Sequence, residues 1–160
     1  MFDRILFAAA ALAGAILAAI VLAISLNVVL RNLAGAPIHG LLDLVEYGLL
    51  IVTFAGAPWV LSRNGHVVVD LVTGALPEQT AVTLARIVAV IGCLLSALVV
   101  YYALQAVLVS YGRGSMIRTA FVVPEWWVLS VMPTSFLLIT VEFARQALNP
   151  PVRSTEKTGL

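Results

Sequence analysis

The chain has 160 residues, of which 62% are hydrophobic and only 11% are charged, and its formal net charge is +1. Soluble domains carry about 25% charged residues, so this composition indicates an integral membrane protein. A net charge this small offers no basic surface for nucleic acid, and we therefore expect no nucleic-acid partner.

Four long apolar runs lie at residues 5–30, 44–61, 87–111 and 126–141. A helix needs about 20 apolar residues to cross a hydrocarbon core of about 30 Å, and lipid-exposed backbone at that depth must be bonded internally. None of the runs alternates polar with apolar residues as a membrane barrel strand does. The predicted fold is therefore an all-α integral membrane protein with one four-helix membrane domain, residues 1–148. We expect its transmembrane helices at about 5–30, 41–61, 86–111 and 125–146, and a disordered cytoplasmic tail at 149–160.

The connection between the second and third helices contains the sequence RNGHVVVD, residues 63–70. In a helical conformation Arg63, His66 and Asp70 would form one polar stripe with valines on the other face, which is typical of a segment lying in the membrane surface. Gly65 would let the chain turn out of the second helix. We expect a short interfacial segment here, although the spacing by itself favours an ordinary solvated connector.

Basic residues are divided unequally between the two sides of the predicted helices. The side of the termini carries Arg4, Arg63, Arg86, Arg145, Arg153 and Lys157, and the other side carries Arg31, Arg113 and Arg118. Because an excess of Lys and Arg marks cytoplasmic segments, both termini are predicted to be cytoplasmic.

The other charged residues also lie near the ends of the spans. Asp43 and Glu46 lie on one face at the outer end of the second helix, and Glu142 and Arg145, three residues apart, could pair at the inner end of the fourth. A charge in the middle of a membrane span is costly and is usually kept for transport. The absence of such a charge argues against a path for substrate or ion through this chain.

The fourth helix opens on Pro124-Glu125-Trp126-Trp127. A proline suits the first turn of a helix, and indoles belong at the level of the lipid headgroups. Pro133 lies further in, where it should kink the helix or leave a carbonyl for a neighbour to satisfy.

A haem or metal site is the next possibility for a small membrane anchor. His39 and His66 flank opposite ends of the second helix, and 27 residues at about 1.5 Å each would separate them by about 40 Å, too far for one iron. One histidine and one cysteine on different elements do not make a zinc site either. We therefore expect no metal and no cofactor in this chain, and no enzymatic activity.

Rows of small residues follow two of the helices. Ala11, Ala15, Ala19 and Ala23 recur at every fourth position, and so do Ala89, Cys93 and Ala97. Such rows let helix backbones approach closely in lipid. Contact with a partner chain and packing within a four-helix bundle are both open at this point.

The stretch DLVEYGLLIVTFAGAPWVLSRNGHVVVDLV, residues 43–72, has an acidic residue, an aromatic residue four later, a Gly-Ala pair and then Arg-x-Gly-His-x-x-Val-Asp. Together with NVVLR at 27–31, Leu76-Pro77 and the Pro-x-Trp-Trp stretch of 124–133, it resembles the small membrane subunit of tripartite ATP-independent periplasmic (TRAP) transporters, the DctQ type. The resemblance covers most of the chain. Where that family usually has two adjacent acidic residues before the second helix, only Asp43 is present here.

The resemblance implies a division of labour within a heteromeric complex of the bacterial inner membrane. A large multi-helix permease subunit would carry the solute, an organic acid, together with sodium ions, and a periplasmic binding protein would deliver the solute. The chain itself would brace the permease, would contact membrane lipids and would help to dock the binding protein. The residues expected at these interfaces are Arg31, Asp43, Glu46, Arg63, Gly65, His66, Asp70, Trp126 and Trp127, with Arg113 and Arg118 as further docking candidates. The competing readings are a stand-alone small exporter with Glu46 as its protonatable site and a membrane anchor of a redox complex.

Overall fold

The structure, a computed structural model, describes residues 2–63 and 78–149. Four of its helices are long and apolar enough to cross a membrane, so the predicted all-α membrane fold is confirmed. The predicted interfacial segment and the tail from residue 150 lie outside the described residues. The elements are α1 (Phe2–Ala34), α2 (Leu41–Ser62), α4 (Glu78–Arg113), β1 (Met116–Arg118), β2 (Val122–Pro124) and α5 (Glu125–Leu148).

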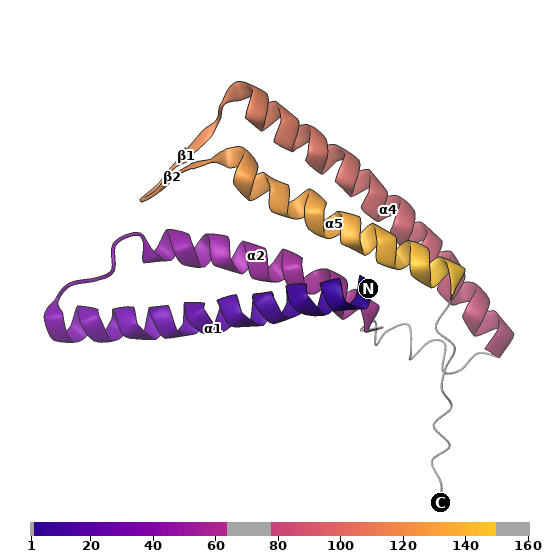
Figure 1. The fold of residues 1–160 in the computed structure, drawn as a ribbon, viewed down its shortest axis with the longest axis horizontal. Coiled ribbons are helices and arrows are strands. Elements are labelled where there is room, and N and C mark those ends of the chain that lie inside the picture. The colour runs from indigo at the N-terminus through magenta and orange to yellow at the C-terminus, as the bar shows by residue number, and fades with distance from the viewer. Residues whose placement is uncertain (1, 64–77, 150–160) are drawn as a thin grey trace, which may run out of the picture.

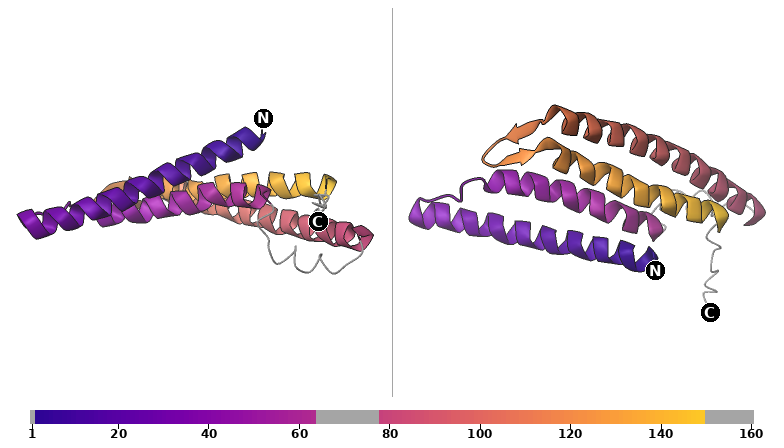
Figure 2. Two further views of the ribbon diagram at one scale, coloured as in Figure 1. Left: turned by 90° about the horizontal axis from the view of Figure 1, so that it is seen from below. Right: turned by 45° about the horizontal axis from the view of Figure 1, so that its top comes forward.

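The helices form a row and not a closed bundle. The two helical hairpins, α1 with α2 and α4 with α5, meet where α2 packs against α5, so that α1 and α4 are the outer helices (Figure 1). Figure 2 shows the row from its edge and from an oblique direction, with the beginning of α1 leaning out of the layer. Both broad faces of the row therefore remain open, as expected for a protein surrounded by lipid and partner chains.

The beginning of α1 and the end of α5 lie on one side of the row. We call this side, where α1 begins and α5 ends, the terminal end, and the opposite side, with β1 and β2, the hairpin end (Figure 1). β1 and β2 pair antiparallel with Met116 opposite Pro124 and Arg118 opposite Val122. These three-residue strands were not predicted, because runs this short give no readable alternation.

The outer helices are longer than the inner ones. α1 has 33 residues and α4 has 36, against 22 in α2 and 24 in α5. At about 1.5 Å per residue α1 and α4 are about 50 Å long, well beyond the about 30 Å of a hydrocarbon core. They must tilt in the membrane or project from it.

The two rows of small residues have different environments. On α4, Ala89 is buried and Cys93 partly buried against α5, and a side chain at Gly92 would meet the ring of Phe143. On α1, Ala11, Ala15 and Ala19 are exposed. The α4 row is thus internal at Ala89 and Cys93 but exposed at Ala97, whereas the α1 row stays outside the fold except at its partly buried last member, Ala23.

Candidate functional site: the seam between the two helical hairpins

The contact between α2 and α5, which we call the seam, depends in its middle on a proline. Pro58 lies inside α2 and is buried, and because proline has no N–H, the carbonyl of Phe54 lacks its usual helical donor. The hydroxyl of Ser135 on α5 donates a hydrogen bond to this carbonyl. The rings of Phe54 and Phe136 lie beside this bond with their centroids 6.3 Å apart. A backbone group that would be orphaned in lipid is thus satisfied across the seam.

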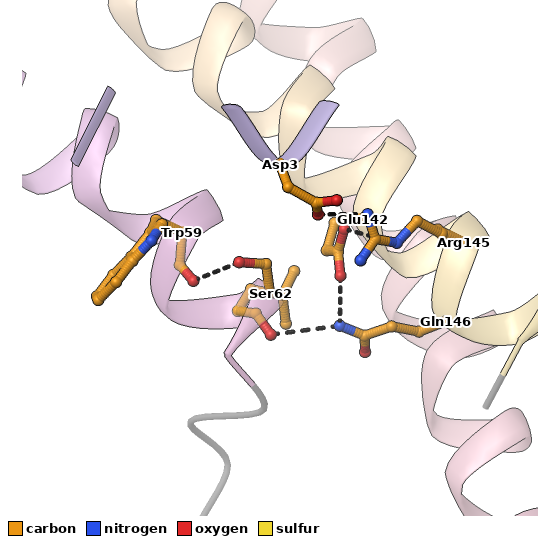
Figure 3. Close-up of polar contacts among 7 residues, drawn as sticks. Asp3, Trp59, Ser62, Glu142, Arg145 and Gln146 are labelled. Atoms are coloured by element: carbon orange, nitrogen blue, oxygen red, sulfur yellow. Dashed lines mark hydrogen bonds and ion pairs between the residues drawn. The ribbon is translucent and has the colours of Figure 1, made fainter. Parts of the chain in front are cut away.

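At the terminal end, a polar network joins α1, α2 and α5 (Figure 3). Gln146 Nε2 donates to Glu142 Oε1 at 3.0 Å and to the Leu61 carbonyl at 3.3 Å. Arg145 pairs with Asp3 Oδ1 at 2.6 Å and lies 3.6 Å from Glu142 Oε2. The predicted pairing of Glu142 with Arg145 is therefore present, but two further elements are joined to it.

Glu142 is the most deeply placed charge of this network. Only 1% of the residue is exposed, and its Oε2 has no hydrogen-bond donor among the described residues. A buried carboxylate needs its donors, because removing one leaves the full cost of desolvation uncompensated. Gln146 consequently joins α5 to the end of α2, and Arg145 joins α5 to the start of α1.

At the hairpin end, Asp43 is hydrogen-bonded to the turn between β1 and β2. The Ala120 N–H donates to the Asp43 carboxylate at 2.6 Å. Gly40, which precedes α2, has a φ of 72° and lies against the ring of Phe121, where a Cβ would come within 2.6 Å of the ring. Only glycine suits both the backbone conformation and this contact. The turn is thus fixed to the start of α2.

Two open surface grooves run beside these contacts. One hollow of about 280 Å³ lies between Ala9 of α1, Phe54 and Ala55 of α2, and Val131 and Thr134 of α5, among others. A second, of about 250 Å³, is lined by apolar side chains including Tyr47, Ile51 and Val128. Polar contacts and open grooves thus alternate along the seam between the two helical hairpins.

The predicted interface residues are not gathered in one place. Arg31 and Glu46 are exposed, and Asp43 is used inside the chain as described above. Arg63 ends α2 with its guanidinium 5.4 Å from the centre of the Trp59 ring. Gly65, His66 and Asp70 lie outside the described residues, so their anchoring role stays a prediction.

The aromatic residues at the hairpin end connect α4 to α5. The rings of Tyr111 and Trp126 meet edge to face at 5.6 Å, those of Trp126 and Trp127 at 5.8 Å, and Ser110 donates to Glu125 at 2.8 Å. The sequence predicted that these indoles lie at the level of the lipid headgroups.

Ser135, Gln146 and Asp3 were missed as site residues. The positions of Glu142, Arg145 and Gln146, separated by three and four residues, show in the sequence that they share a helix face. The sequence also shows that Pro58 leaves the carbonyl of Phe54 without a helical donor. The partners of these groups on other helices could not be predicted, because no local pattern pairs Asp3 with Arg145.

The arrangement defines a multi-pass membrane protein whose polar residues connect its own helices. Within residues 2–63 and 78–149, no group of three His, Cys, Asp or Glu residues is placed to hold a metal ion.

Comparison with known families identifies the class of transporter. The family model described as tripartite ATP-independent periplasmic transporters, DctQ component, matches residues 20–150. The chain belongs to this family, and it is a small membrane component of a TRAP transporter, as the resemblance predicted. A search of curated proteins found no match.

Replacing Asp43 with alanine should release the turn between β1 and β2, because Ala120 N–H then loses its acceptor. We expect amide exchange at residues 118–122 of the purified chain to become several-fold faster. The matched control is Glu46→Ala, which removes the same charge one turn further along α2 from a side chain that is exposed. Equal exchange in the two variants would show that Asp43 does not hold the turn.

Replacing Gln146 with leucine should destabilise the terminal end, because the carboxylate of Glu142 loses a donor while staying buried. We expect the free energy of unfolding in detergent to fall by about 1–3 kcal/mol. The double variant Glu142→Leu/Gln146→Leu should recover most of this loss, since both polar partners are then gone. A double variant less stable than Gln146→Leu would contradict this account of the network.

Proposed function

We propose that this chain is the small accessory membrane subunit of a sodium-coupled TRAP uptake transporter for organic acids. It braces the large permease subunit, which carries the solute and sodium, and it helps to dock the periplasmic binding protein. In this proposal the chain lies in the bacterial inner membrane with both termini in the cytoplasm, and it catalyses no reaction. The membership in the DctQ family supports the proposal.

The observation that carries the bracing role is the seam. Three separate polar contacts, one at each end and one in the middle, join the two helical hairpins. Contacts spaced along the whole length of α2 oppose both sliding and rotation of α5. A rigid row of helices is what a moving neighbour requires as a fixed support.

The distribution of charge supports an accessory role in place of transport through this chain. Residues 5–30, 47–62, 87–112 and 126–141 contain no charged side chain. Organic acids and sodium ions need polar ligands to cross a membrane. The carrying groups are therefore assigned to the large subunit.

Reconstitution tests the proposal directly. Vesicles that contain the large permease subunit, this chain and the binding protein should take up an organic acid that the binding protein binds, when sodium is higher outside. Vesicles that lack this chain should lose most of that uptake, and vesicles with this chain alone should show none.

Two results with this chain alone, one in vesicles and one with the purified protein, would overturn the proposal. Proton-driven efflux that Glu46→Gln abolishes would establish a stand-alone exporter. A haem absorbance band in the purified chain would establish a redox anchor.

The docking role rests on the exposed cations of the hairpin end. Arg31, Arg113 and Arg118 are exposed there. Of the nearby carboxylates, Asp43 and Glu125 are hydrogen-bonded within the chain, and Glu46 is exposed. An acidic patch on the binding protein would complement these arginines.

Neutralising Arg118 should weaken docking more than neutralising a cation at the terminal end. We expect Arg118→Gln to raise the binding-protein concentration needed for half-maximal uptake several-fold, and Arg4→Gln to leave it unchanged. Purification of the complex should be unaffected by either change. A requirement that is the same for both variants would remove Arg118 from the docking surface.

A further inference from the structure

The outer side of α4 carries three hydrogen-bonding side chains at membrane depth. Tyr101 and Tyr102 are 58% and 61% exposed, and Gln105 is exposed as well. Gln105 lies four residues after Tyr101 and three after Tyr102, so the three side chains are neighbours on one helix face. Among the described residues none of these side chains has a hydrogen-bond partner.

These groups lie far from the headgroups. The apolar run 87–111 has its midpoint at residue 99. Tyr101 and Tyr102 are at most three residues from that midpoint, about 4.5 Å along the axis, and Gln105 is about 9 Å from it. Half of a hydrocarbon core is about 15 Å. The Cα atoms of all three residues therefore lie within the hydrocarbon region, which contains no water.

The direction in which these side chains lean keeps them within the hydrocarbon region. Side chains of a helix lean toward its N-terminus, and α4 runs from the terminal end to the hairpin end. Gln105 therefore leans away from the nearer headgroups at the level of Tyr111 and Arg113. An acyl chain supplies neither donor nor acceptor, so lipid leaves the amide unsatisfied.

Three polar side chains on α1 and α2 form a hydrogen bond within the chain. Ser25 donates to the Val21 carbonyl at 2.8 Å, Asn27 accepts from the Ile38 N–H at 2.7 Å, and Thr53 donates to the Leu49 carbonyl at 2.8 Å. Lipid can cover these residues at little cost. The outer side of α4 differs, since its polar groups need a partner from outside the chain.

The same side of α4 has the spacing of a helix–helix contact. Exposed residues recur at alternating intervals of four and three: Ile87, Ile91, Leu94, Leu98, Tyr101, Gln105, Leu108 and Gly112. This is the heptad spacing of side chains that interlock with a second helix. A polar side chain at one such position fixes the register of the partner.

We propose that this face of α4 binds a transmembrane helix of the large permease subunit, one that presents hydroxyl or amide side chains to Tyr101, Tyr102 and Gln105. The inference rests on the proposed function, which supplies a second integral membrane subunit. It adds which edge of the row that subunit covers and the chemistry by which it is recognised.

Photocrosslinking in the complete transporter tests this placement. Leu94 or Leu108 is replaced by p-benzoylphenylalanine on the α4 face, and Leu22, which is 70% exposed on α1, serves as the control position. We expect both α4 positions to crosslink to the large permease subunit several-fold more than Leu22 does.

A set of polar variants tests the chemistry. The triple variant Tyr101→Phe/Tyr102→Phe/Gln105→Leu keeps the size of each side chain, and it should reduce the co-purified permease subunit about ten-fold. Thr53→Val, which removes a hydroxyl bonded to its own helix, should leave the yield unchanged. Circular dichroism of each purified variant checks that folding is preserved.

The outcomes separate this inference from the proposed function. If the permease subunit co-purifies but the α4 positions crosslink only to lipid or to a second copy of this chain, the α4 assignment is wrong and the bracing role stands. Full co-purification with the folded triple variant would also overturn the assignment. If the unmodified chain does not co-purify with the permease subunit at all, the proposed function itself fails.

Discussion

The carbonyl of Phe54 determines how the two helical hairpins meet. A backbone carbonyl in hydrocarbon must accept a hydrogen bond, and Pro58 removes the donor that the α-helix would provide. The hydroxyl of Ser135 supplies it from α5. Because this donor is a short side chain, the two backbones must approach closely at this level, and α5 must present one face. Gln146, about three turns further along α5, contacts α2 from that same face.

Polar contacts have this importance because lipid gives helices no hydrophobic reason to associate. Apolar side chains gain nothing by leaving acyl chains for one another, and the open grooves of about 280 and 250 Å³ between α2 and α5 are spaces that acyl chains can fill. Specific hydrogen bonds then fix geometry. Asp43 acts at one end of α2, and Gln146 and Glu142 act at the other. The row is rigid where it is polar, and α4 packs on α5 through small residues such as Gly92 and Ala89.

The sequence predicted the elements that depend on local composition and missed those that depend on distant partners. Apolar length gave four helices, and residue spacing gave the pairing of Glu142 with Arg145. The start of α4 at Glu78 was missed because a helix outside the hydrocarbon needs no apolar run. The row in place of a bundle was missed because it follows from contacts such as Ser135 with Phe54 and Asp3 with Arg145, 81 and 142 residues apart. The position of a proline shows which carbonyl loses its helical donor, but the neighbouring sequence does not show which residue replaces that donor.

A row of helices, unlike a bundle, has two edges, and a sequence can give them different surroundings. On α1 the polar side chains of Ser25 and Asn27 are bonded within the chain, and the exposed residues around them are small or aliphatic. On α4 the side chains of Tyr101, Tyr102 and Gln105 are exposed, and they have no such bonds to the residues that the structure describes. In a subunit surrounded only by lipid, an unsatisfied polar side chain would be equally costly at both edges. With the permease subunit on α4, as proposed, a row attached along one edge can stay fixed while the neighbour's mobile parts move.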